Sequence, residues 1–232
     1  MLKTFALLLT FLVSSLAQNQ GPSVTGALAS GSSSSPIRSS NVTSSASALT
    51  LAAAIPSGAV VGDICVFSYS GQNFYSTYSS GWTIEVATNQ SYWNGTFFYK
   101  VLTSGDLTSG FSITTTGSAS PMILIGVDLM PTVTTYVTTA YGENTTTPAS
   151  VTVPALSGVS AGNVVLYVSS YRGSTVPTVS RGSLLQNVTT GTAGAGAVYW
   201  EKLLSGFSTA VTYNFPGTYS PQGYYNGYIA FN

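Results

Sequence analysis

The pattern of apolar and polar positions predicts β-strands along the chain from about residue 47 onward. Short runs rich in Val, Ile, Thr, Tyr and Phe alternate with clusters of Gly, Pro, Ser and Asn, a pattern typical of strands separated by turns. The runs cover 64–69, 96–102, 111–116, 122–130, 164–169, 197–204, 210–215 and 224–231. No segment combines an apolar stripe of helical period with good caps. We therefore expect an all-β protein.

Similar sequence elements recur in the same order about a hundred residues apart. The matching pairs are 57–64 with 157–164, 98–102 with 200–204, and 120–121 with 220–221. The preserved order favours a duplication over chance similarity, with halves at about residues 47–131 and 150–232. Because each half is small for an independent β core, we expect a single two-sheet β-sandwich of jelly-roll type, built from the two similar halves.

The repeated Ser-Gly-x-x-x-Gly-Asp/Asn element is interpreted as a turn that leads into a buried strand. Its glycines permit a tight turn, and the side chain of Asp63 or Asn163 can accept a hydrogen bond from the backbone of that turn. Asp63 as a calcium ligand is the alternative. Calcium prefers several oxygen ligands, and no second acid lies near Asp63 in the sequence, so the turn is favoured.

The N-terminus has the features of a secretory signal peptide. Lys3 supplies a positive charge, residues 5–12 form a short apolar run, and Ser15 and Ala17 are small residues before the expected cleavage after Ala17. Neither this run nor any later one reaches the roughly 20 apolar residues that a membrane-spanning helix needs. We therefore expect residues 1–17 to be removed, and the protein to be secreted to the cell surface without a membrane span.

Residues 18–46 are of low complexity and predict a flexible tail ahead of a sandwich domain at 47–232. Within the tail, residues 23–30 are compatible with an extended strand, and Val24 and Leu28 would lie on one face of it. The strand could belong to the chain's own domain, or the whole tail could be a disordered spacer. The sequence leaves these alternatives open.

Export agrees with the presence of sequons for N-glycosylation, which lie in polar or turn-like stretches. The acceptor residues are Asn41, Asn89, Asn94, Asn144 and Asn187. N-linked glycans are therefore expected, and no cofactor is. The single Cys65 excludes an intramolecular disulfide, and its apolar neighbours predict a buried thiol.

The composition argues against catalysis. Only 5% of the residues are charged and there is no histidine, which removes Ser-His-Asp and Cys-His catalytic groups and metal sites built on His. Two carboxylates would suffice for a glycosidase, but no pair stands out. The net charge is zero and the basic residues are scattered, so a nucleic-acid surface is not predicted. We expect no enzyme, no catalytic residue and no metal ligand.

Low charge also has consequences for stability and assembly. A protein with few ionisable groups takes up few protons on unfolding, so we expect it to tolerate acid. It also has little electrostatic repulsion between copies, which favours association.

Aromatic residues supply the remaining binding signal. Phe74, Tyr75, Tyr78 and Trp82 crowd one predicted loop, and Trp93 follows it. Because sugars stack on exposed aromatic rings, the candidate glycan contacts are Tyr75, Tyr78, Trp82 and Trp93. The alternative is that Trp82 anchors the loop to the core.

Together, the export signal, the strand-capable tail, the Ser-rich linker and the glycosylated all-β domain resemble the jelly-roll subunits of archaeal threads and bundling pili, in particular the thread filaments of thermoacidophiles. In that group the tail of one subunit inserts as a strand into its neighbour, which is called donor-strand complementation. The resemblance implies that Val24, Ala27 and Leu28 lie in a donor strand, and that the protein binds copies of itself in an extracellular filament. The alternative function is a secreted adhesin that binds surface glycans through the aromatic loop.

Overall fold

The structure is a computed structural model. It describes residues 35–87, 93–130, 136–144, 149–190, 194–206, 209–216 and 223–232, and for 136–144 it describes the strand without its side chains. The described residues form sixteen strands and one short helix, which confirms the all-β prediction. No helix in these ranges has the length and apolar character needed to cross a membrane.

Eight of these sixteen strands coincide with the predicted apolar runs, and the other eight lie outside them. The strands are β1 (Ile37–Ala48), β2 (Thr50–Ala53), β3 (Ile64–Gly71), β4 (Tyr75–Tyr78), β5 (Thr83–Ala87), β6 (Asn94–Val101), β7 (Phe111–Thr115), β8 (Ser120–Leu129), β9 (Tyr136–Asn144), β10 (Ser150–Val153), β11 (Val164–Tyr171), β12 (Thr178–Val179), β13 (Ser183–Thr189), β14 (Ala195–Lys202), β15 (Val211–Asn214) and β16 (Tyr224–Phe231). The helix α1 (Ser104–Ser109) connects β6 to β7.

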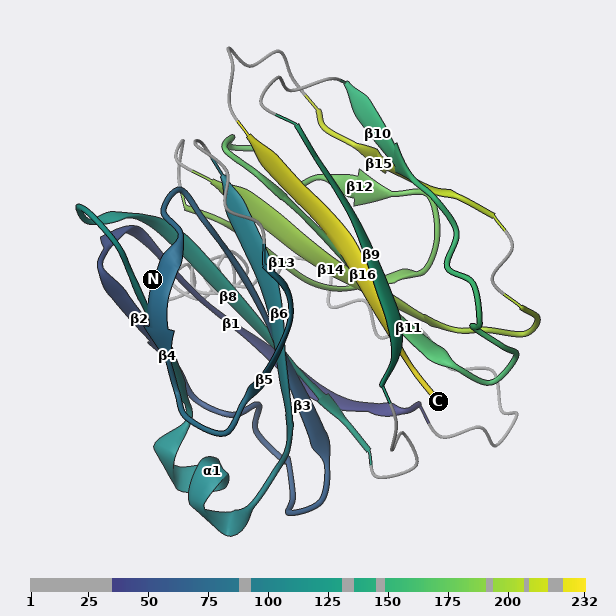
Figure 1. Ribbon diagram of the computed structural model, residues 1–232, viewed down its shortest axis with the longest axis horizontal. Coiled ribbons are helices and arrows are strands. Elements are labelled where there is room, and N and C mark those ends of the chain that lie inside the picture. Colours follow the sequence, from purple (N-terminus) through teal and green to yellow (C-terminus); the bar gives the residue numbers. More distant parts are fainter. Residues whose placement is uncertain are drawn as a thin grey trace, which may run out of the picture. The chain divides into compact units, whose positions relative to one another are not determined.

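The strands form four antiparallel sheets, two from each half of the chain (Figure 1). The first half gives a five-stranded sheet, β1-β8-β3-β6-β5, and a three-stranded sheet, β2-β7-β4. The second half gives β9-β16-β11-β14-β13 and β10-β15-β12, which is the same order when β9 is matched with β1. The expectation of a single two-sheet sandwich was therefore wrong in its number of sheets.

The physical reason is that the inner strands of both five-stranded sheets are covered on both faces. Every residue of β3, β8, β11 and β16 is buried, so alternate side chains enter two different cores. Val66 and Val168 belong to a central core between the two five-stranded sheets. Phe67 and Tyr167 belong to two outer cores, each shared with the three-stranded sheet of the same half. The result is sandwich-like packing of four layers.

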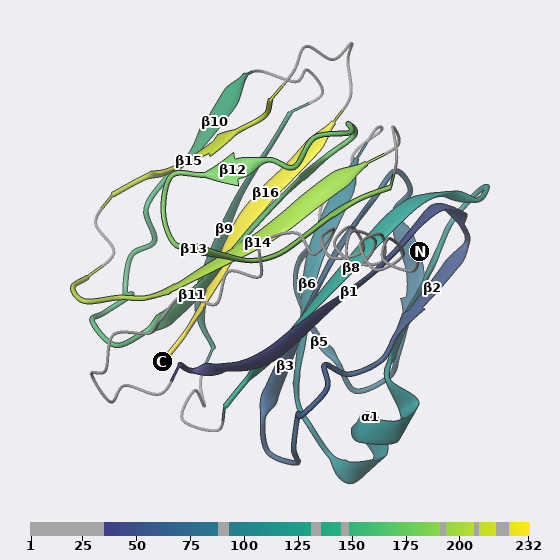
Figure 2. The same ribbon diagram turned by 180° about the vertical axis from the view of Figure 1, so that it is seen from behind.

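The two five-stranded sheets lie face to face in the central core (Figures 1 and 2). β1 contacts β13, β8 contacts β14, β3 contacts β11, β6 contacts β16, and β5 contacts β9. The two equivalent strand orders therefore run in opposite directions across the interface: β1 and β9 lie at opposite edges, and β3 and β11 meet in the middle. Trp93 spans this interface, where its indole nitrogen donates a hydrogen bond to the Ser170 hydroxyl at 3.0 Å.

Part of the predicted tail belongs to the folded domain. Residues 37–46 lie in β1, which pairs antiparallel with β8 along almost its whole length. Its Ser and Thr side chains suit an edge position, whereas Ile37 and Val42 pack against the central core. For these residues the prediction of a flexible tail was wrong. Residues 1–34 lie outside the described part, and with them the expected signal peptide and Val24, Ala27 and Leu28.

Candidate functional site

The repeated turn element has the predicted structure in both halves. The Val60 amide donates to Asp63 Oδ2 at 3.0 Å, and the Ser160 amide donates to Asn163 Oδ1 at 2.7 Å. Gly62 and Gly162 have φ values of 96° and 92°, a conformation that glycine adopts without strain. The interpretation as a turn is confirmed.

Asp63 also belongs to a cluster of charges that the sequence did not reveal. Arg38 Nε donates to Asp63 Oδ2 at 2.8 Å and lies 3.6 Å from Asp128 Oδ2. Both carboxyl side chains have an exposed fraction of 0%, so one guanidinium on β1 serves two buried acids. Burial raises the pKa of Asp128 to about 7, with a further contribution from the negative charge of Asp63. Cys65, opposite Asp128 in the sheet, is buried, and its burial holds the thiol pKa well above the usual value, which disfavours the nucleophilic thiolate.

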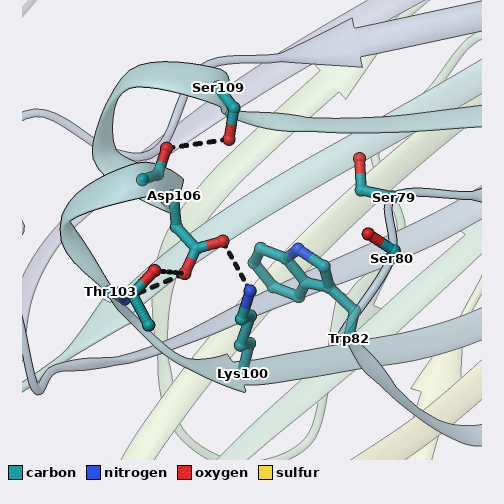
Figure 3. A pocket seen from close by; sticks show the side chains of 9 residues that line it. Ser79, Ser80, Trp82, Lys100, Thr103, Asp106 and Ser109 are labelled. Atoms are coloured by element: carbon teal, nitrogen blue, oxygen red, sulfur yellow. Dashed lines mark hydrogen bonds and ion pairs between the residues drawn. The ribbon is translucent and has the colours of Figure 1, made fainter.

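A pocket of about 480 Å³ opens beside α1 (Figure 3). It is lined by Ser79, Ser80, Trp82, Lys100, Thr103, Gly105, Asp106, Ser109 and Gly110. Lys100 Nζ donates to Asp106 Oδ1 at 2.6 Å, and the Thr103 amide and hydroxyl donate to Asp106 Oδ2 at 2.8 and 2.6 Å. The Lys100–Asp106 ion pair neutralises both charges, and the bonds between Thr103 and Asp106 cap the N-terminus of α1.

The same bonds set the protonation of Asp106. Partial burial would raise its pKa, but the hydrogen bonds from Lys100 and Thr103 outweigh that effect and hold the pKa below the usual value. The carboxylate therefore stays ionised and is a poor general base. With the hydroxyls of Ser79 and Ser80, the pocket suits an uncharged polyhydroxyl ligand better than a reaction.

Both tryptophans predicted as glycan contacts are buried, which makes the prediction wrong for Trp93, whereas Trp82 still lines the pocket beside α1. Trp82 is 5% exposed and packs on Phe67 and Phe111, with ring centroids 5.4 and 4.8 Å away, as the core-anchor alternative proposed. Trp93 is 1% exposed. A buried ring cannot stack on a sugar.

Tyr75 and Tyr78 are half-buried and lean on Phe98, with ring centroids 5.6 and 4.8 Å away. The structure therefore leaves part of these two rings at the surface. They are the members of the predicted aromatic set that remain candidates for contact with a ligand.

The sequons differ sharply in accessibility. Asn187 is exposed on β13, an edge strand. Asn94 is 1% exposed and its amide nitrogen donates to the Gln72 carbonyl at 2.9 Å, so a glycan at Asn94 has no space, and this prediction was wrong. Asn41 is half-buried and donates to the Ala54 carbonyl at 2.7 Å. Asn89 and the Asn144 side chain lie outside the described part.

The second half of the chain also contains an ion pair between residues distant in the sequence, Arg181 and Glu201. Arg181 Nε lies 2.8 Å from Glu201 Oε1, and the Tyr167 hydroxyl donates to the same carboxylate. Burial raises the pKa of Tyr167 far above the usual value, with a further contribution from this hydrogen bond to Glu201, so the phenol stays protonated. Like the ion pairs of the first half, this one therefore holds neighbouring parts of the fold together.

Comparison of the chain with protein-family models, with curated proteins and with solved structures gives no match. The function must therefore be argued from the described residues themselves, and the resemblance to thread and pilus subunits stays a hypothesis.

Proposed function

We propose that the protein is a secreted structural subunit of a cell-surface filament, which assembles head to tail when residues 23–30 of one copy add as a strand to the next. The observation that carries the proposal is that the four sheets of the described residues have edge strands, whereas Arg38, Lys100 and Arg181 form ion pairs within the fold. An edge strand presents unpaired backbone groups to which an extended segment can bond.

The proposal includes a jelly roll in each half. Successive strands β1 to β4 alternate between the five-stranded and the three-stranded sheet, and β7 and β8 again lie in different sheets. Such alternation is expected when a long hairpin wraps around a sandwich. It supports a scaffold whose edges, rather than an enclosed site, contact other molecules.

The test keeps the length of the tail and changes one face of the candidate strand. Val24→Lys with Leu28→Lys places two charges on the face predicted to bind, and Thr25→Lys with Ala29→Lys places the same charges on the opposite face. Negative-stain electron microscopy should show filaments for the wild type and the control, and dispersed particles for Val24→Lys/Leu28→Lys. Filaments of equal length in all three proteins would contradict the role of the tail.

A second candidate function is glycan binding in the pocket beside α1, favoured by its hydroxyl lining and its neutralised ion pair. Ser80 is exposed at the pocket, so Ser80→Tyr should fill the cavity, whereas Ser183→Tyr on exposed β13 should not. A glycan array compares the two. Loss of a signal in Ser80→Tyr alone supports this function, and absence of any signal from the wild type removes it.

A further inference from the structure

We propose that Asp63 and Asp128 form a buried acid pair that holds one proton in the folded protein, and that this proton makes the protein more stable in mild acid than at neutral pH. The inference concerns the folded domain and does not depend on the proposed filament.

The geometry places two buried acids beside one partly exposed cation: the side chains of Asp63 and Asp128 are 0% exposed, and that of Arg38 is 32% exposed. Asp63, in the turn before β3, receives both the Nε and the Nη2 hydrogen bonds of Arg38, at 2.8 and 3.3 Å. Asp128, on β8, is left with the longer 3.6 Å approach to Nε. Neither oxygen of Asp128 has a partner with full hydrogen-bond geometry within the described part of the chain, although Asp63 and the Ser39 hydroxyl lie near enough to affect its pKa. Such a carboxylate has lost its water without gaining a full replacement.

The charges that surround Asp128 do not balance two carboxylates. Arg38 faces it from β1, Asp63 from the turn, and the neutral Cys65 thiol from β3. Lys100 lies on β6 opposite Cys65, but it is bonded to Asp106 of α1 at 2.6 Å. With both acids ionised the group would carry a net negative charge in the interior, so a single proton on the pair restores neutrality.

The pKa of about 7 for Asp128 agrees with this balance of charges. Burial and then the charge of Asp63 raise the pKa, and the charge of Arg38 lowers it by less than they raise it. An ordinary aspartate has a pKa of 3.8. Between these two values the folded state holds a proton that the unfolded state has released. The folding equilibrium constant therefore falls as the pH rises, by about tenfold per pH unit at most, and levels off above about pH 7.

The second half of the chain provides a neutral counterpart. Asn163 takes the place of Asp63 in the repeated turn, and Ala230 pairs with Val165 where Asp128 pairs with Cys65. The same strands and turn thus form without an acid pair. The acids of the first half are not required by the fold as such, and the pH dependence they add is a property of that half.

The experiment measures urea unfolding of the secreted full chain between pH 5 and pH 8. The wild type should lose at least tenfold in its folding constant from pH 5 to pH 7 and change little above. Asp128→Asn imitates the protonated acid, so its profile should be nearly flat and it should be more stable than the wild type at pH 8. Asp106→Asn, in the same half but outside the pair, should keep the dependence of the wild type on pH.

Arg38→Met keeps the inference testable if Asp128→Asn folds poorly. Removing the guanidinium leaves two acids without a cation, so the fall in stability should extend to higher pH and become larger. Carboxyl NMR of labelled aspartate should show one resonance titrating near pH 7 in the wild type. A flat wild-type profile, stability that falls toward pH 5, or an undiminished pH dependence in Asp128→Asn would overturn the inference.

Discussion

Gly95 on β6 packs directly against the ring of Tyr225 on β16 in the other half. A Cβ atom built on Gly95 would lie 2.0 to 2.4 Å from ring atoms of Tyr225 on β16. Gly196 on β14 is its equivalent in the second half, because Gly95 pairs with Ser70 and Gly196 pairs with Ser170. The nearest atoms to a Cβ on Gly196 would be the Ile123 methyls and Ser170 Cβ, at 3.5 to 3.6 Å, which is ordinary contact distance. Gly95→Ala and Gly196→Ala therefore add the same methyl group, but only at Gly95 would that methyl group overlap with a neighbouring side chain.

The magnitude follows from how far Tyr225 would have to move. An ordinary contact needs about 3.4 Å, so its ring must shift by roughly 1.4 Å within a core where it is 0% exposed. Overpacking of this kind costs about 1 to 3 kcal/mol, and a rigid buried ring places Gly95→Ala near the upper end. Gly196→Ala should be within about 0.5 kcal/mol of the wild type, since the loss of unfolded-state entropy is favourable. Neither glycine has a positive φ, so backbone strain does not separate them.

Differential scanning calorimetry and urea unfolding measure the difference. For a domain of this size about 3 kcal/mol lowers Tm by roughly 6 to 12 °C, so Gly95→Ala should melt well below both Gly196→Ala and the wild type. Equal melting temperatures for the two variants would refute the described packing of β6 on β16.

Three further outcomes are expected. Trp93→Phe should cost about 1 to 2 kcal/mol by urea unfolding, because the buried Ser170 hydroxyl loses its indole donor; an unchanged stability would contradict that bond. Mass spectrometry of tryptic glycopeptides should find carbohydrate on Asn187 and none on Asn94, which is enclosed; a glycan on Asn94 would contradict its burial. Asp106→Asn should lower the free energy of unfolding by about 1 to 2 kcal/mol, measured at pH 7, since it weakens the cap of α1 and the bond to Lys100.

Strand positions could be predicted from the sequence because apolar and β-branched residues cluster between turn residues. What the pattern could not reveal is how many sheets the strands form. A strand such as β3, ICVFSYSG, is apolar at most of its positions because both of its faces are buried. A continuous apolar run shows that each face of the strand contacts a core, but it does not show which sheet covers each face.

The site residues were harder to predict because burial depends on the other half of the chain. Trp93 and Asn94 follow a polar stretch, yet the approach of β11 and the Gln72 carbonyl encloses them. Asp128 did carry a signal: it is a single acid within the apolar run 122–130, and an acid in a buried strand needs a partner. The partner, Arg38, lay in a segment whose serines indicated a flexible linker.

The central claim is that this chain builds a filament through its N-terminal segment. Negative-stain imaging of the protein purified from the cells that produce it tests it most directly. The account predicts filaments of regularly spaced globular units, which dissociate or fail to form in Val24→Lys/Leu28→Lys. Dispersed single particles in the purified native protein would contradict it.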